Sequence, residues 1–170
     1  MTQRRNLGTV PSPEPAVDEK TAAADPIARS GWPAVRHRIE LYATVALGSV
    51  IGGILRALAS LAIQDHPEAG FPWGTLFVNV TGSFVIGFYA ALTGPDGRVL
   101  AGPRQRQFVM TGICGGYTTF SAFGLETFRL LQAGNLPAAG FNVGISVVSW
   151  LAAVWLGYTL AMRLNRLKGS

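Results

Sequence analysis

This chain is poor in charged residues and almost free of cysteine. Only 14% of its 170 residues are charged, which is low for a soluble domain, and 49% are hydrophobic. Cys114 is the single cysteine, so no intrachain disulfide can form. The two histidines, His37 and His66, lie outside the apolar parts of the chain, so neither is placed to activate a serine or cysteine there. We therefore do not expect an enzyme.

Acidic residues are missing from the centres of the apolar segments. Glu40 stands at the start of the first segment and Glu126 stands late in the third, so neither is well placed to exchange protons across a membrane. The missing carboxylates argue against one possible function, that of a small four-helix proton-coupled exporter of the multidrug type, which we keep as an alternative. A scaffold subunit without transport is a second alternative.

An apolar targeting segment is missing from the amino-terminal region. Residues 1–37 are rich in proline, alanine and charge, and they contain no continuous apolar run. Such a composition predicts a disordered cytoplasmic tail rather than a signal peptide.

What the chain does contain is four long apolar blocks. Each is close to the roughly 20 residues that a helix needs to cross a bilayer. We therefore predict an all-α protein of the cell membrane, with a four-helix transmembrane domain over residues 38–164 and a short basic tail over 165–170. The blocks cover residues 39–63, 73–93, 108–131 and 136–162.

Positive charge gathers at the ends of these blocks. The net charge of +5 would suggest nucleic acid as a partner of a soluble protein, but here the cations more simply orient the chain in the membrane. The loop between the first two blocks carries Asp65, His66 and Glu68 without any Lys or Arg. We predict that both termini lie in the cytoplasm, on the side of Arg29, Arg36, Arg38, Arg98, Arg104, Arg106, Arg163, Arg166 and Lys168.

Small and polar residues form a stripe along the first block. Gly48, Gly52, Arg56 and Ser60 recur every fourth residue, which predicts a packing face that Ser49 and Gly53 widen. An arginine this far from the ends of a span normally faces a water-filled space or a partner. The simpler alternative is a side chain that extends to the membrane surface.

The second and fourth blocks carry similar stripes. Thr75, Asn79 and Ser83 share one face of the second block. The Asn79 amide needs a partner at this depth, and either a neighbouring helix or a passing solute would serve. Asn142 and Ser146 share a face of the fourth block.

The third block holds a run of glycines and hydroxyls over residues 112–123. Glycine weakens helices, and lipid offers no water to satisfy a freed backbone group. We therefore predict a broken third helix that lies inside protein or along a cavity. Phe120 and Phe123 follow the break three residues apart. Aromatic residues at this spacing are usually core, although the positive edge of a phenyl ring can also attract an anion.

The segments 52–56, 74–84 and 112–123 together resemble the CrcB/Fluc fluoride channels, and the likeness covers roughly residues 41–162. The resemblance implies a fluoride-specific ion channel that exports cytoplasmic fluoride passively and so lowers its toxicity. It also implies an antiparallel dimer of the dual-topology type. A structural, non-transported Na⁺ would lie at the dimer interface, held by the backbone carbonyls of Gly115 and Thr118 from each subunit.

The resemblance also implies which side chains fluoride would meet. This chain departs from the family pattern at Ala122, Asn142 and Trp150, where threonine, tyrosine and a small hydroxyl residue are expected. The lining of the fourth span is therefore the least defined. The implied fluoride pathway consists of Asn79, Phe120, Phe123 and Ser146, with Thr75 and Ser83 as weaker candidates and Arg56 as a charge at a vestibule or interface.

The charge distribution conflicts with a simple antiparallel homodimer. Cations concentrated on one side of the membrane favour one fixed orientation, whereas a dual-topology chain needs near balance. The dimer partner is therefore expected to be either a second copy of this chain or a related subunit of opposite orientation. The other expected partners are fluoride and membrane lipid.

Overall fold

The computed structural model describes residues 31–63, 71–95 and 97–166. The chain divides into a first unit, Met1–Arg36, and a second unit, His37–Ser170. Only the beginning of one helix belongs to the described part of the first unit. Residues 1–30 of the tail predicted over 1–37 and residues 167–170 of the basic tail predicted over 165–170 lie outside the described residues. The acidic loop with Asp65, His66 and Glu68 lies outside them as well.

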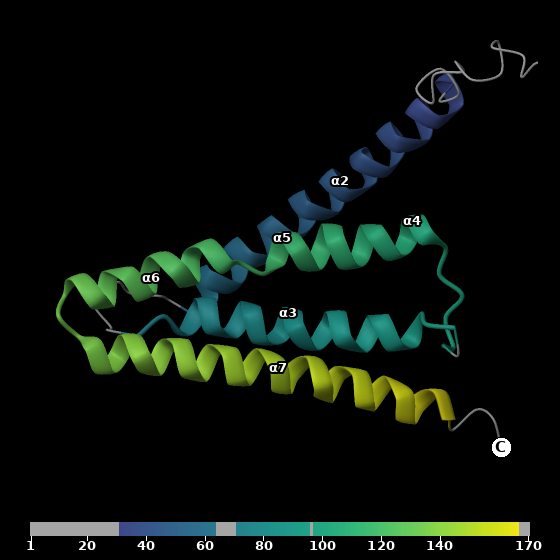
Figure 1. Cartoon of the computed structure of the whole chain (residues 1–170). Helices are drawn as coiled ribbons and strands as arrows, with labels where there is room; N and C mark the ends of the chain where they lie inside the picture. The colour runs from purple at the N-terminus through teal and green to yellow at the C-terminus, as the bar shows by residue number, and fades with distance from the viewer. Residues whose placement is uncertain (1–30, 64–70, 96, 167–170) are drawn as a thin grey trace, which may run out of the picture. The chain divides into compact units, whose positions relative to one another are not determined.

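Apart from the connections, the described residues are helical, and they contain no strand. Three long helices are α2 (Trp32–Ile63), α3 (Trp73–Leu92) and α7 (Leu136–Arg166). Between α3 and α7 the chain forms a series of shorter elements (Figure 1). These are α4 (Pro103–Arg106), the π-helix η2 (Gln107–Cys114), α5 (Gly115–Tyr117) and α6 (Phe120–Gln132).

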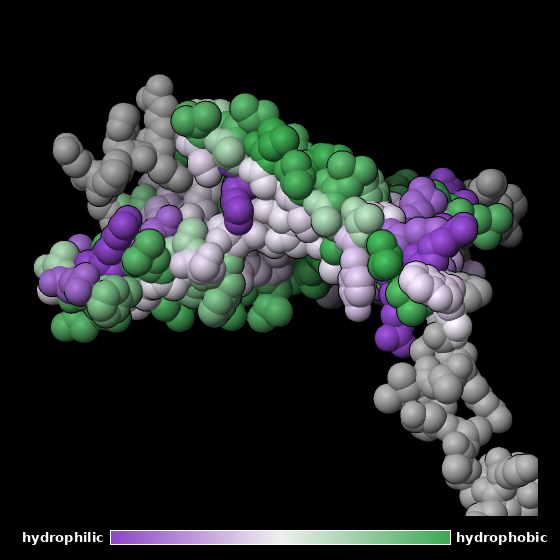
Figure 2. Space-filling model, turned by 90° about the horizontal axis from the view of Figure 1, so that it is seen from above, coloured by the Kyte–Doolittle hydropathy of each residue, from purple (hydrophilic) through white to green (hydrophobic). Residues whose placement is uncertain are grey.

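Within the described residues, three helices are long and apolar enough to cross a membrane, namely Val35–Ile63, Trp73–Leu92 and Leu136–Arg166. Large apolar side chains on these helices are exposed, including Leu58 at 58% and Leu151 at 65%. Figure 2 shows broad apolar surface between more hydrophilic ends. A soluble monomer rarely exposes so much contiguous apolar surface, and a bilayer would cover it.

The helix boundaries differ from the predicted ones at several points. Helix α2 begins at Trp32, before the expected start of the transmembrane domain at residue 38, and α7 continues to Arg166, beyond residue 164. The block predicted over 108–131 corresponds to η2, α5 and α6. The π-helical hydrogen bonding of η2 was not predicted, because apolar periodicity does not distinguish it from α-helix.

Helices α3 and α7 pack against each other through glycine. A Cβ atom added at Gly87 would lie 2.4 Å from the carbonyl oxygen of Val154, and one at Gly157 would lie 2.2 Å from that of Phe84. Both distances are too short for any side chain, so the two backbones touch only because these positions are glycine. The pair runs in the same direction along the bundle (Figure 1).

The glycine stripe of the first block packs against the irregular segment, as its spacing predicts. An added Cβ at Gly48 would lie 2.6 Å from the carbonyl oxygen of Phe108, and one at Gly52 would lie 2.2 Å from that of Ile113. Ser49 joins this contact through Gly116. Gly53 does not, since an added Cβ there would meet nothing within 4 Å.

Basic residues lie at one end of the second unit, where hydrogen bonds and an ion pair connect the ends of several helices. Arg104 forms an ion pair of 2.7 Å with Glu40, and Arg106 Nη1 donates to the Thr93 carbonyl at 2.7 Å. Asn165, near the end of α7, donates to the Ala91 carbonyl at 3.0 Å. The cations between the second and third blocks and those after the fourth therefore lie at the same end, as the sequence predicts. Their cytoplasmic position stays a prediction.

Candidate functional site

The site is built around two residues between α5 and α6. Thr118 has φ −80° and ψ 158°, and Thr119 has φ −148° and ψ 121°. These extended dihedrals end one helical segment and begin the next. Thr119 acts as the N-cap of α6, because its hydroxyl oxygen accepts from the Ala122 N–H at 3.1 Å.

The side-chain amide of Asn79 on α3 forms two hydrogen bonds with the extended backbone at Thr119. Its Nδ2 donates to the Thr119 carbonyl at 2.9 Å, and its Oδ1 accepts from the Thr119 N–H at 2.7 Å. In a continuous α-helix that N–H would donate to the Gly115 carbonyl instead. Asn79 is 5% exposed and thus replaces the helical hydrogen bond in a buried place. The sequence showed that Asn79 needs a partner, and the structure shows that a backbone amide is one.

A second side chain reaches the same backbone from α2. Arg56 Nη1 donates to the Thr118 carbonyl at 3.3 Å, a long hydrogen bond. The Thr118 hydroxyl donates back to the Cys114 carbonyl at 2.9 Å, so its proton is already used. The half-buried Arg56 therefore places a positive charge beside the interrupted backbone.

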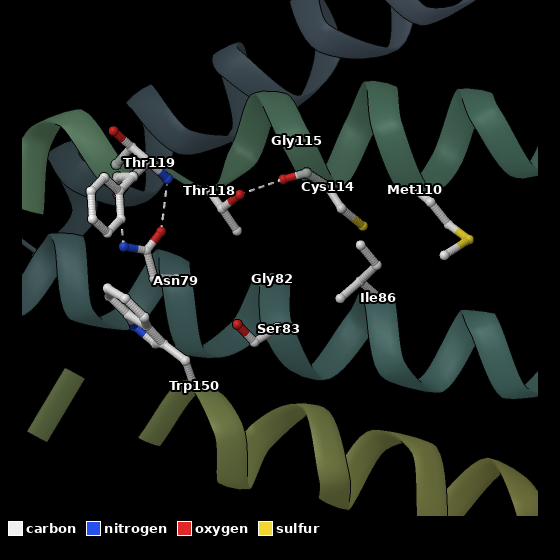
Figure 3. Close-up of a pocket in the computed structure, with 11 residues that line it drawn as sticks. Asn79, Gly82, Ser83, Ile86, Met110, Cys114, Gly115, Thr118, Thr119 and Trp150 are labelled. Atoms are coloured by element: carbon white, nitrogen blue, oxygen red, sulfur yellow. Dashed lines mark hydrogen bonds between the residues drawn. The ribbon is translucent and has the colours of Figure 1, made fainter. Parts of the chain in front are cut away.

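A cavity of about 260 Å³ lies on one side of Asn79 (Figure 3). Helices α3 and α7, η2, α5 and the first residue of α6 contribute to its wall. No acidic or basic side chain is among the described residues that line it. Its lining includes Asn79, Ser83, Gly115, Thr118, Phe120 and Trp150.

A second cavity of about 490 Å³ lies beyond Thr119, which lines both cavities. Its wall carries Arg56, Thr75 and Glu126, and the Thr75 hydroxyl donates to Glu126 Oε1 at 2.7 Å. In the sequence, Glu126 stands late in the third apolar block, away from its centre. Helix α6 brings this half-buried carboxylate into the cavity wall instead.

Three aromatic rings follow one another beside the first cavity. The ring centroids of Phe120 and Phe123 are 5.5 Å apart, and those of Phe123 and Trp150 are 5.0 Å apart with planes at 74°. Phe120 lines the cavity and is 75% exposed, whereas Phe123 is 8% exposed and lines neither cavity. Trp150 departs from the family pattern and was expected as an interfacial or packing residue, and it lines the cavity.

The structure does not bring every candidate to these cavities. Ser146 is 1% exposed and lines neither of them. Asn142, also 1% exposed, donates to the Thr127 hydroxyl at 2.8 Å and so connects α7 to α6. Of the remaining candidates, Asn79, Ser83, Phe120, Gly115 and Thr118 line the first cavity, and Thr75 and Arg56 line the second.

Comparison with known proteins identifies the family of the chain. The family model described as CrcB-like protein, Camphor Resistance (CrcB), matches residues 43–158. The chain belongs to the CrcB family. The matched range contains α3 and α6 completely, most of α2 and α7, and both cavities.

Several CrcB relatives cover most of the chain. The "Fluoride-specific ion channel FluC 1" of Rhodopseudomonas palustris (strain BisB18) is 65% identical over 136 residues, which are 80% of this chain and 96% of that protein. The protein of the same name from Bradyrhizobium diazoefficiens is 62% identical over 76% of this chain and 90% of its own length. "Fluoride-specific ion channel FluC" of Opitutus terrae is 54% identical over 78% of this chain and 100% of its own length.

These findings determine the class of the protein. Its relatives are ion channels and not enzymes. Together with the membrane-length helices, membership of the CrcB family makes this chain a multi-pass membrane protein. The predicted family and the prediction that the chain is not an enzyme are thereby confirmed.

Proposed function

We propose that this chain forms a fluoride-specific ion channel. The relatives' names support the choice of ion. The observation that carries the proposal is the first cavity, which combines amide and hydroxyl groups with aromatic rings and has no acidic or basic side chain in its described lining. An anion that enters it meets hydrogen-bond donors and ring edges without a repelling carboxylate.

The cavity chemistry suits fluoride better than chloride. Fluoride is small and strongly hydrated, so a pore has to replace its lost water with good donors. The Asn79 amide has two N–H groups, and only one donates to Thr119, so the second is available. The larger chloride accepts hydrogen bonds more weakly, and a narrow set of donors compensates its dehydration less well. We propose Asn79, Ser83 and Phe120 as the pathway in this cavity, with Thr75 in the second.

We further propose that α4, η2, α5 and α6 together form a fourth, interrupted membrane crossing. Up to α5 and again from α6 the segment is helical, and its two extended residues are held by α2 and α3 rather than left to lipid. Two chains in antiparallel orientation would then complete the pore walls around the exposed Phe120. Phe123 and Ser146 stay candidates for a pathway completed in this way.

A structural Na⁺ is consistent with the interrupted backbone. Because Thr119 N–H donates to Asn79, the Gly115 carbonyl loses its helical donor, and Ala122 N–H likewise turns from Thr118 to the Thr119 hydroxyl. Carbonyl oxygens released from helical pairing in this way are suitable ligands for a cation, and the Thr118 oxygen would meet it while also accepting from Arg56 Nη1 at 3.3 Å. We propose that Gly115 and Thr118 of two chains hold the ion, which would secure the dimer interface.

We propose the energetics of transport from the lack of a sequence motif that would couple transport to an energy source. The sequence contains no nucleotide-binding motif, so we propose passive flow down the electrochemical gradient. An interior-negative membrane drives an anion outward by about 2.3 kcal/mol per 100 mV. Hydrogen fluoride enters cells as a neutral molecule and dissociates in the cytoplasm, so an outward path for the ion lowers fluoride toxicity.

Anion efflux from liposomes tests the function. Purified protein is reconstituted with internal fluoride or internal chloride, and release is followed with ion-selective electrodes after the membrane potential is clamped. We expect rapid fluoride release and chloride release near that of protein-free liposomes. Equal release of both anions, or no release of either, would contradict the proposal.

The composition of the dimer needs a separate measurement. Of the nine cations assigned to the cytoplasmic side, six lie in the described second unit, and one cation, Arg129, lies near the opposite turn. This bias supports a partner subunit of reversed orientation. Reporter fusions at the carboxyl terminus would show one orientation for such a heterodimer and both orientations for a homodimer.

A further inference from the structure

Trp150 presents a hydrogen-bond donor that the described part of the chain does not use. Its Nε1 is buried, and no described residue accepts a hydrogen bond from it. An indole N–H is a donor only and can make one hydrogen bond. Burying such a group without an acceptor costs about 1–3 kcal/mol, so its place in the structure needs a reason.

The surroundings of Trp150 indicate which acceptor is missing. The side chain shares its cavity with Asn79 and Ser83, whose polar atoms belong to the proposed fluoride pathway. Other donors at this site already have acceptors: the Thr118 hydroxyl donates to Cys114 and the Thr119 N–H donates to Asn79. Among the described residues of this cavity, the indole N–H, the second Asn79 N–H and the Ser83 hydroxyl thus remain as donors for an anion.

The indole ring is held in a fixed place. It meets the ring of Phe123 at a centroid distance of 5.0 Å and an angle of 74°. Phe123 is itself 8% exposed and packs against Phe120, which lines the same cavity. This row of rings restricts the directions in which Nε1 can point, and a donor held in place loses little entropy when it binds an ion.

We propose that the Trp150 indole N–H donates a hydrogen bond to fluoride in this cavity. The inference rests on the proposed channel function and deepens it. Trp150 lies one turn beyond Ser146, where the family resemblance led us to expect a small hydroxyl residue. In this chain the indole therefore supplies the donor that the hydroxyl would have supplied, and Ser146 is buried away from the cavity.

Flux measurements with two matched variants test the proposal. Trp150→Phe removes the N–H and keeps an aromatic ring, and Trp155→Phe makes the same change on the same helix at a side chain that is 64% exposed. We expect Trp150→Phe to lower fluoride release by about tenfold and Trp155→Phe to leave it unchanged. Equal release by Trp150→Phe and the unmodified chain would overturn the inference while leaving the channel function intact.

A spectroscopic measurement separates a direct contact from a packing effect. The chain has four tryptophans, so replacing Trp32, Trp73 and Trp155 with phenylalanine leaves one indole ¹⁵N–H resonance. We expect fluoride to shift this resonance and chloride at the same concentration to leave it in place. If fluoride does not shift the resonance in protein that still releases fluoride from liposomes, Trp150 has a packing role and does not bind the ion. If the unmodified chain releases no fluoride, the proposed function itself fails.

Discussion

Two parts of the bundle use the backbone in opposite ways. In α3 and α7 the backbone groups are satisfied within each helix, and glycines at 87 and 157 bring the two helices together. Between α5 and α6 the chain gives up that internal pairing, and side chains from α2 and α3 take its place. The regular pair therefore acts as a support, whereas the irregular segment exchanges its internal hydrogen bonds for contacts with other helices and is the part that we propose meets the solute.

The largest expected effect comes from a charge at the support of the irregular segment. Asn79→Asp places a carboxylate oxygen where Nδ2 now donates to the Thr119 carbonyl at 2.9 Å. Two acceptors then repel each other, and the new negative charge also repels an entering anion. We expect fluoride efflux from liposomes to fall by at least about a hundredfold with the oligomer still intact by size-exclusion chromatography.

Asn135→Asp is the matched control for this substitution. Asn135 Oδ1 accepts from the Ala138 N–H at 3.2 Å, and a carboxylate can accept the same hydrogen bond. Efflux should remain at the level of the unmodified chain. If both variants lost flux equally, a general sensitivity to added charge would replace the role assigned to Asn79.

The second prediction concerns the place where α2 supports the irregular segment. Gly52→Ala puts a methyl group 2.2 Å from the Ile113 carbonyl oxygen and 2.7 Å from the Tyr117 nitrogen. Overpacking of this kind costs about 1–3 kcal/mol, and it displaces the backbone that leads into the site. We expect fluoride efflux to fall more strongly than thermal stability. Gly53→Ala, which meets nothing within 4 Å, should change neither quantity.

In the packed pair of helices α3 and α7, the third prediction is a larger loss of thermal stability than of fluoride efflux. Gly157→Ala puts a methyl group 2.2 Å from the Phe84 carbonyl oxygen and forces α7 away from α3. Since both helices keep their own hydrogen bonds, we expect a lower thermal unfolding temperature with fluoride efflux reduced only a few-fold, in line with a loss of about 1–3 kcal/mol. Gly144→Ala on the same helix has open space around it and serves as the control. Loss of all flux at unchanged stability would contradict the supporting role of this pair.

The smallest effect is expected at Arg56. Its hydrogen bond to the Thr118 carbonyl is 3.3 Å long, so its contribution lies more in charge than in geometry. Arg56→Lys keeps the charge and should retain most of the flux, whereas Arg56→Gln should lower it by only about twofold, the low end of what one intramolecular hydrogen bond contributes. Efflux measured over a series of Na⁺ concentrations would also show whether Arg56 opposes cation binding at Thr118. Identical flux in the two variants would contradict an electrostatic role.

The sequence predicted the supporting part of the molecule better than the site. Hydrophobic block length located α3 and α7, and the four-residue spacing of Gly48 and Gly52 identified a packing face, because periodicity reports directly on which residues share a face. It does not report which atom lies opposite. The pairing of Asn79 with the Thr119 backbone, the approach of Arg56 to Thr118 and the inclusion of Trp150 in the cavity depend on how separate helices meet.

Glu126 illustrates the same limit from another direction. Its position late in an apolar block made it look peripheral, yet α6 begins anew at Phe120 and brings it level with Thr75. Distance along the chain from the centre of a block measures depth only when the helix is continuous. The helix is interrupted at Thr118 and Thr119, so distance along the chain no longer gives the depth of Glu126, and the composition of the block does not give it either.

The π-helix η2 has a consequence for how this family can change over evolution. Its hydrogen bonds join residues five apart instead of four, so each turn holds more residues than an α-helical turn and can accommodate one inserted residue. Deleting one residue from Gln107–Cys114 would let the segment return to α-helical spacing while its flanking elements stay in register. The same deletion in α3 would rotate every later side chain by about 100° and bring Asn79 out of line with Thr119. Length variation among descendants of this chain is therefore expected to concentrate in η2.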